Sequence, residues 1–497
     1  MGVMRFAVYP EGLLDAEADL PRAYISGFDG RVFASRFEVD GDVVDFRRVT
    51  ADSGKLQVPY PVEGFGKPVV STASLREHKD PYILSLELAR GKICQVRNQL
   101  ATWEGLGMQI PDEFRIVHKE AHHLFAQATA AKPDVAEVTR LADQAIAKAF
   151  VAIDQLANAY VRQRLSVRFQ RSPTLPVSFG CSINCVDTPY KQREPFLETF
   201  NAAAIPIEWK QIEPVEGEYN WDSCDELVAW CMENRLLMRG GPLLDLSPKG
   251  LPDWLNQWGH DYYNLQSFLC DFVETAISRY AGKVRMWEVS SRVNTGGSFN
   301  LNEEERLTLV ARTLEVARES DEEGQLMIRI EDPWGSYLSA GEHRLSPIQF
   351  VDALLRCGVG LSGINLEFSV GYNIKGSAPR DLLDISRLLD QWGMLEVPLN
   401  VTLAFPSCSG TDPNASDEVP VAENCWRSPW SEKAQSDWID SVFPLLMAKQ
   451  SVAGIYWSHL TDASRHVFPN AGLIDSNGSP KPAFQSILDQ RTGKWLK

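Results

Sequence analysis

Between residues 176 and 490 the chain alternates short apolar runs with helical stretches, and this pattern limits the possible folds more than any other feature. The runs recur at regular spacing along the segment: Leu236–Arg239, Val284–Val289, Leu326–Ile330, Gly363–Phe368, Leu399–Phe405 and Val452–Trp457. Strands separated by helices pair in parallel through crossover connections. A segment of roughly 315 residues fits an α/β fold of the (β/α)8 TIM barrel type, with insertions, better than an open sheet. The site of such a barrel lies at the carboxyl ends of its strands.

The first 110 residues have a different pattern, in which apolar and polar residues alternate. Arg31–Val39 and Val43–Val49 flank the turn signal Gly41-Asp42 and read as a hairpin, and Tyr82–Leu88 and Gly91–Val96 read as further strands. We therefore predict an N-terminal β-sandwich-like domain over residues 1–110, of a kind that often binds carbohydrate.

A helical hairpin is predicted for residues 111–170, because the period of the apolar residues changes there to that of a helix. Its second stripe is apolar at Leu141, Ala145, Ala149, Ile153, Leu156 and Tyr160. Such a stripe needs a partner surface, and the linker at Ser172–Pro176 is short. We therefore expect the hairpin to pack between the sandwich and the barrel, so that they form one rigid unit.

The chain is acidic, since 49 Lys and Arg residues stand against 66 Asp and Glu residues, a formal net charge of −17. Such a surface repels phosphate backbones and anionic lipids, so we predict neither nucleic acid nor membrane as a partner. No stretch approaches the roughly 20 apolar residues that span a bilayer. The amino terminus lacks the apolar region of a signal peptide, which favours a cytoplasmic location.

The nine cysteines contain no CxxC pair, so we predict buried free thiols and no metal or other cofactor. A disulfide between Cys408 and Cys425, which bracket a polar loop, is the alternative. The remaining candidate ligands lack partners at metal-binding spacing and are assigned packing or surface roles: His122, His123, His459 and His466.

Four stretches of the barrel segment resemble the glycoside hydrolase family 10 xylanases, in the same order along the chain: Glu213-Pro214 within Trp209–Trp221, Leu251–Leu255 after Leu237–Leu243, Tyr280–Val289, and Pro480–Phe484 after Ile455–Trp457. The resemblance does not extend to residues 1–170. It implies a TIM barrel that hydrolyses a polysaccharide with two glutamates, one at the end of the fourth strand and one on the seventh.

Neither glutamate of the family is present where the resemblance places it. The acid/base position falls on Arg292 and the nucleophile position on Leu403. A guanidinium stays protonated near neutral pH and an apolar side chain cannot attack a sugar, so hydrolysis of the family type is not expected. Most sugar-binding positions of the family are also replaced, by Glu208, Gly241, Asp245, Glu367 and Ser369, while Trp457 is retained.

Several carboxylates stand at predicted strand ends and could form a different hydrolytic pair. The candidate catalytic residues are Glu367 with Glu331 or Asp245, because strands five, six and three converge at the barrel mouth. The other interpretation is that these acids are solvated or paired with arginine, and Arg292 is expected to pair with one of them. The candidate substrate-binding residues are acidic or aromatic: Glu208, Asp332, Trp334, Trp426, Trp430 and Trp457.

Three functions are therefore compatible with the sequence. The first is a xylanase-like protein that binds or acts on a polysaccharide or oligosaccharide without retaining hydrolysis of the family type. The second is a glycoside hydrolase that uses the relocated carboxylates. The third is a structural or interaction platform, since a fold does not by itself determine a function.

Overall fold

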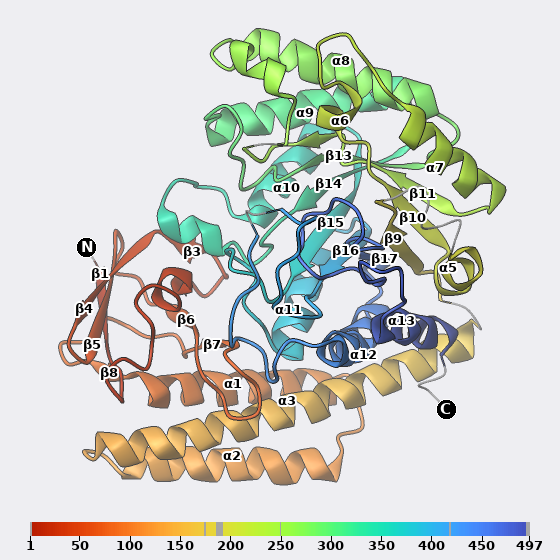
Figure 1. The fold of residues 1–497 in the computed structure, drawn as a ribbon. Coiled ribbons are helices and arrows are strands. Elements are labelled where there is room, and N and C mark those ends of the chain that lie inside the picture. The colour runs from red at the N-terminus through yellow and green to blue at the C-terminus, as the bar shows by residue number, and fades with distance from the viewer. Residues whose placement is uncertain (1, 173–174, 185–191, 249, 417–418, 494–497) are drawn as a thin grey trace.

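The computed structural model describes residues 2–172, 175–184, 192–248, 250–416 and 419–493. At its centre is a closed barrel of eight parallel strands, which confirms the predicted TIM barrel (Figure 1). In order around the barrel these are β9 (Ser178–Ser182), β10 (Ala202–Ile205), β11 (Leu237–Gly240), β13 (Met286–Ser291), β14 (Gln325–Ile330), β15 (Leu361–Ser369), β16 (Leu399–Ala404) and β17 (Val452–Trp457). Strand β17 pairs with β9 and closes the barrel, and the short strand β12 (Leu244–Asp245) pairs with β13.

Helices surround the barrel and bury the outer faces of its strands. They are α5 (Arg193–Thr199), α6 (Trp209–Ile212), α7 (Asp222–Glu233), α8 (Tyr262–Tyr280), α9 (Glu303–Ser320), α10 (Pro347–Cys357), α11 (Leu382–Gly393), α12 (Glu432–Ala448) and α13 (Pro482–Thr492). The longer ones start at side-chain caps, as at Asn302 and Ser346, where capping boxes satisfy the first backbone N–H groups.

The register of the strands decides which side chains enter the barrel. Glu367 pairs with Thr402, which pairs with Tyr456. The next row contains Phe368, Leu403 and Trp457. Paired residues point to the same face of a sheet and successive residues to opposite faces. Because Thr402 and Glu367 line the barrel mouth, the row of Leu403 and Trp457 faces the helices.

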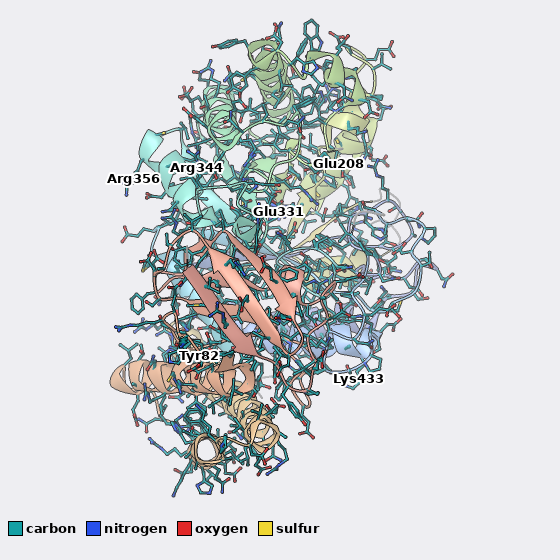
Figure 2. The ribbon with its side chains drawn as sticks, turned by 90° about the vertical axis from the view of Figure 1, so that its left-hand side faces the viewer. Tyr82, Glu208, Glu331, Arg344, Arg356 and Lys433 are labelled. Carbon is teal, nitrogen blue, oxygen red and sulfur yellow. The ribbon has the colours of Figure 1, made fainter. Side chains whose placement is uncertain are left out.

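The N-terminal region contains two four-stranded sheets, as the sequence predicts. One has the order β4 (Ser35–Asp40), β5 (Val43–Arg48), β1 (Gly2–Ala7), β8 (Tyr82–Ile83), and the other β3 (Val32–Phe33), β2 (Tyr24–Ser26), β6 (Lys55–Pro59), β7 (Val69–Ser71). The predicted strands at Tyr82–Leu88 and Gly91–Val96 are wrong beyond Ile83, since α1 (Leu84–Gly105) occupies this stretch. Figure 2 views the molecule from the side of these sheets.

Two long helices, α2 (Asp112–Ala130) and α3 (Val135–Arg171), lie where the sequence predicts the hairpin. Helix α3 has 37 residues and runs from the N-terminal sheets along α1 to α12 of the barrel (Figure 1). Its Ala157, Val161 and Leu165 belong to the same hydrophobic core as the barrel. The N-terminal region and the barrel thus share buried apolar contacts.

A buried ion pair also joins the two regions. Lys92 on α1 is fully buried, and its Nζ lies 2.5 Å from Oδ2 of Asp381, the residue that caps α11. Asp384 Oδ2 lies 3.6 Å from the same nitrogen. Among the described residues, none of the helices is long and apolar enough to cross a membrane.

The described cysteines are all free thiols, including Cys408 and Cys425, so the alternative of a disulfide between these two is wrong. Cys185 and residues 173–174 of the predicted linker lie outside the described residues.

Candidate functional site

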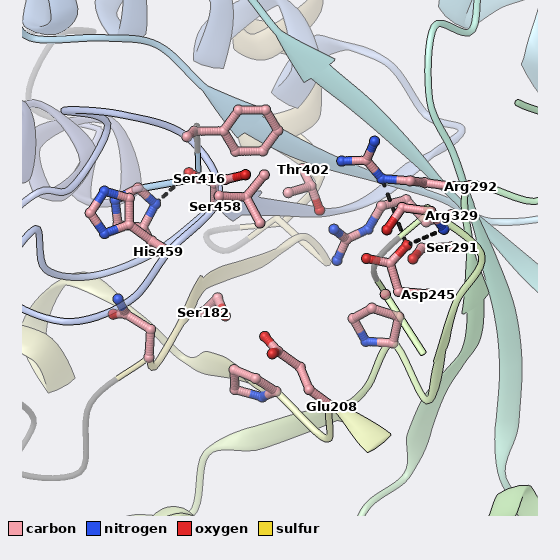
Figure 3. Close-up of a pocket in the computed structure, with 18 of the residues that line it drawn as sticks. Ser182, Glu208, Asp245, Ser291, Arg292, Arg329, Thr402, Ser416, Ser458 and His459 are labelled. Carbon is pink, nitrogen blue, oxygen red and sulfur yellow. Dashed lines mark hydrogen bonds and ion pairs between the residues drawn. The ribbon is translucent and has the colours of Figure 1, made fainter. Parts of the chain in front are cut away.

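A cavity of about 330 Å³ opens at the carboxyl ends of the barrel strands. Five of the predicted charged residues line it: Glu208, Asp245, Arg292, Glu331 and Glu367. Figure 3 shows Arg292, Arg329 and Asp245 together at the right and Glu208 apart from them at the bottom. The convergence that the strand pattern predicts for these side chains is therefore present.

Each of these side chains is placed by the end of a strand or the turn that follows it. Glu208 is the residue before α6, and Asp245 ends β12. Arg292 follows β13 with a φ of 55°, a conformation that is uncommon outside glycine. Glu331 follows β14, and Glu367 lies two residues before the end of β15.

Arg292 is held by carboxylates on two neighbouring elements. Its Nε lies 3.7 Å from Oδ1 of Asp245, and its backbone N–H donates to Oε1 of Glu331 at 3.0 Å. The ion pair agrees with the interpretation that Arg292 pairs with an acid of the barrel mouth. A cation fixed in this way can bind an anionic or hydroxyl oxygen but cannot act as a general acid.

Glu331 and Glu367 both have an increased proton affinity. Burial and the charge of Glu367 raise the pKa of Glu331 well above its usual value, and burial raises the pKa of Glu367. Arg329 partly offsets this effect, since its Nη1 lies 3.5 Å from Oε2 of Glu367. Oε2 of Glu331 is buried and has no hydrogen-bond partner in the described part of the chain. Burial also raises the pKa of Glu208, whose carboxylate accepts a hydrogen bond from Gln211.

Below the cavity, a polar network fills the barrel interior. Glu288 is fully buried and pairs with Arg329, whose Nη2 lies 2.6 Å from its Oε1. Asn365 donates to the other oxygen of Glu288 at 2.5 Å and accepts from Thr402 at 3.0 Å. Arg239 lies over the ring of Tyr456, 3.8 Å from its centroid. These residues form the floor of the site and hold Arg329 toward the cavity.

Strand register turns two of the residues named from the sequence, Trp457 and Leu403, away from the cavity. Trp457 is only 1% exposed, its Nε1 donates to the carbonyl oxygen of Ala471 at 2.7 Å, and it packs on Trp438 of α12. It therefore cannot stack on a ligand. Leu403 shares its row and faces the helices, so the side chain of β16 that faces the cavity is Thr402.

The other predicted binding residues lie away from the cavity. Trp334 is covered by the guanidinium of Arg380, 4.5 Å from its ring, in a groove between the barrel and the N-terminal sheets. Trp426 and Trp430 pack edge-on against Phe405. Asp332 is buried and accepts hydrogen bonds from the hydroxyl of Ser336 and the N–H of Tyr337. None of these four side chains is among the described residues that line the cavity at the barrel mouth.

A histidine cluster on one wall of the cavity was not predicted as part of the site. His459 and His466 stack with ring centroids 4.2 Å apart, and both line the cavity. Asp412, from a distant loop, accepts from Nε2 of His466 at 2.9 Å. The sequence gives no signal for this pairing, because 54 residues separate the two partners.

Ligand atoms of His459, Asp462 and His466 lie within 4.8 Å of one another, a spacing that could hold a metal ion. However, the ammonium of Lys481 already lies 2.5 Å from Oδ2 of Asp462. Both nitrogens of His466 also lie against oxygen atoms, Nε2 at 2.9 Å from Oδ2 of Asp412 and Nδ1 at 2.7 Å from the carbonyl of Ser464. In this arrangement the three side chains are engaged with one another, with Lys481, with Asp412 and with Ser464 as a hydrogen-bonded network.

Comparisons with known proteins agree with this architecture. The profile of Glycosyl hydrolase family 10 matches residues 182–330. Endo-1,4-beta-xylanase 3 of Hypocrea jecorina is 29% identical over 287 residues, which cover 57% of this chain and 72% of the relative. Endo-1,4-beta-xylanase C of Paenibacillus barcinonensis is 25% identical over 235 residues, covering 43% of this chain and 20% of that protein.

Among solved structures, native xylanase 10B from Thermotoga maritima superimposes with a TM-score of 0.50 at 18% identity. The match covers 68% of this chain and 98% of the xylanase. The matched 68% of the chain is similar in length to the barrel segment, residues 176–490. The protein is therefore built on a barrel with the xylanase-like fold of glycoside hydrolase family 10.

Proposed function

We propose that the barrel mouth binds a carbohydrate and does not hydrolyse it by the retaining mechanism of the xylanases. The observation that carries this proposal is that no carboxylate stands at the two strand ends where the xylanase mechanism needs its glutamates. Strand β13 is followed by Arg292, which pairs with Asp245, and β16 presents Thr402 to the cavity. Retaining hydrolysis needs a proton donor and a carboxylate nucleophile at a close spacing. Neither position supplies one.

The cavity itself supports a binding role. Its volume of about 330 Å³ lies near the lower end of the roughly 300–1,000 Å³ typical of ligand pockets, which suits a short saccharide. Carboxylates and guanidinium groups in its lining offer acceptors and donors to sugar hydroxyls. The similarity to xylanases makes xylo-oligosaccharides the first ligands to test.

We expect xylobiose or a related short oligosaccharide to give a saturable heat signal in calorimetric titration. The variant Glu208→Gln should weaken this binding at least about tenfold, because a hydrogen bond to a charged group contributes about 1.5–3 kcal/mol. Glu216→Gln, on an exposed loop, is the matched control and should bind as the natural chain does. A flat titration against xylo-, cello- and uronate-bearing oligosaccharides would contradict the proposal and favour the platform role.

Hydrolysis by a relocated pair is a second candidate, supported by Glu331 and Glu367. Both line the cavity, and each has a raised pKa caused first by burial. One carboxyl group that keeps its proton beside one that is ionised is the arrangement that glycoside hydrolysis requires.

If the natural chain releases reducing sugar from any glycan, Glu367→Gln should lower the rate by about 10²–10⁴-fold, the usual contribution of general acid–base catalysis. Glu331→Gln should have an effect of the same order, and Glu216→Gln should have none. The measurement is a reducing-sugar assay at substrate saturation, with thermal melting to show that each variant folds. An unchanged rate in Glu367→Gln would remove this pair from consideration.

A further inference from the structure

Three side chains at the end of β17 form a continuous hydrogen-bonded chain on the cavity wall. Oγ of Ser458 lies 3.2 Å from Nδ1 of His459, and Nε2 of His459 lies 3.1 Å from Oδ1 of Asp462. Ser458 and His459 both line the cavity, and Figure 3 shows their contact as a dashed line. Ser458 is half-buried, so its hydroxyl is accessible from the cavity.

The surroundings of Asp462 determine where the protons lie. Its Oδ1 accepts the backbone N–H of Gly472 at 2.7 Å, and its Oδ2 faces the ammonium of Lys481. Burial alone would raise the pKa of Asp462, but the hydrogen bond from His459 and the charge of Lys481 outweigh it and hold the pKa below its usual range. Asp462 is therefore ionised, and Nε2 of His459 donates to it.

The imidazole of His459 is neutral at physiological pH. It is buried, and burial lowers the pKa of this histidine to about 4. Since Nε2 carries the single proton, Nδ1 presents its lone pair to the hydroxyl of Ser458. A serine hydroxyl bound to a neutral imidazole, which a carboxylate orients in turn, is the arrangement that activates a serine nucleophile.

We propose that Ser458, His459 and Asp462 form an acyl-transfer site that hydrolyses esters; the substrate class, an O-acylated sugar, rests on the proposed binding of carbohydrate in the same cavity. Ser458 is the nucleophile, His459 is the base, and Asp462 orients the imidazole. This goes beyond the proposed binding function, because it assigns a reaction to residues that neither the xylanase mechanism nor the relocated carboxylates use.

The reaction has two steps. In the first, Oγ of Ser458 bonds to the ester carbonyl carbon while its proton passes to Nδ1 of His459, and the C–O bond to the sugar breaks as that proton moves to the leaving sugar oxygen. In the second, water attacks the acyl-serine, gives one proton to His459, and releases the carboxylic acid as the proton returns to Oγ. Arg465, which lines the same cavity, supplies positive charge for the oxyanion of each intermediate.

The test is covalent labelling of the full-length chain with a fluorophosphonate, followed by mass measurement of the intact protein and of its peptides. We expect one adduct, on Ser458. Ser458→Ala should remove it, and His459→Gln should slow labelling at least about 100-fold, since loss of a general base costs about 10²–10⁴-fold. Ser320→Ala, a half-buried serine on α9, is the control and should label at the natural rate.

Two results would overturn the proposal. One is the absence of an adduct on Ser458 in the natural chain, and the other is equal labelling of His459→Gln and the natural chain. Labelling that disappears with a chelator would also overturn it, because the cluster would then depend on a metal. The probe carries no sugar, so this outcome is independent of whether the cavity binds oligosaccharides.

Discussion

Replacing Lys92 with methionine is expected to lower the free energy of unfolding by about 3–5 kcal/mol, the usual cost of breaking a buried ion pair from one side. The ammonium of Lys92 is fully buried between Asp381 and Asp384, at 2.5 and 3.6 Å. Methionine has a similar length but no charge, so the buried carboxylate of Asp381 would lose its counter-ion at the contact between α1 and α11. Urea unfolding, analysed for both midpoint and slope, measures the change.

The control for this variant is Lys433→Met. Lys433 forms an exposed pair with Asp437 at 2.8 Å on α12, and exposed pairs contribute about 0–1 kcal/mol. The triple variant Lys92→Met, Asp381→Asn, Asp384→Asn should recover much of the loss, because no buried charge then remains unpaired. A loss below about 1 kcal/mol in Lys92→Met would show that water reaches these carboxylates.

Removing residues 1–173 is expected to leave a barrel that aggregates. Helix α3 contributes Ala157, Val161 and Leu165 to the core of the barrel, and Leu383 of α11 packs in a cluster with residues of α1 and α3. Without these helices the barrel would expose a contiguous apolar face, and such faces promote association. Gel filtration and thermal melting of residues 174–497 provide the measurement.

The matched control cuts the covalent linker between the two regions but keeps all of their non-covalent contacts. A protease site inserted between α3 and β9 and cut after folding should leave the two fragments in one complex during gel filtration. A monodisperse barrel that melts at the temperature of the full chain would contradict this expectation. It would mean that the two regions are joined mainly by their covalent linker.

The barrel could be predicted from the sequence because its strands are short, apolar and regularly spaced, and the structure confirms this. The helix α1 could not be predicted from the sequence. Its first half is buried on nearly all sides, including Ser85, Glu87 and Lys92, so this part lacks the apolar stripe of a surface helix. The alternation of Leu84, Leu86 and Leu88 then resembles a strand.

The candidate site was predictable only in part, for a related reason. Carboxylates at strand ends converge in any parallel barrel, which is why Glu208, Asp245, Glu331 and Glu367 meet in one cavity. The sequence could not show that the side chains of Trp457 and Leu403 point toward the helices. Strands buried on both sides have no alternation of apolar and polar residues that would reveal which residues point into the barrel. The histidine cluster depends on Asp412, whose approach to His466 is set by a long loop.

The length of α3 has a consequence for the order in which this protein can fold as it is synthesised. At about 1.5 Å per residue the helix is about 55 Å long, and Arg168 in its last turn donates to the carbonyl of Met447 in α12, 279 residues later in the chain. Until α12 has been synthesised, the last turns of α3, with Val161 and Leu165, lack this partner, while its earlier turns already pack on α1 and α2. The core of the N-terminal region is built from residues 4–150 and can form first, whereas the barrel core, which includes the end of α3, is complete only after β17 has joined β9.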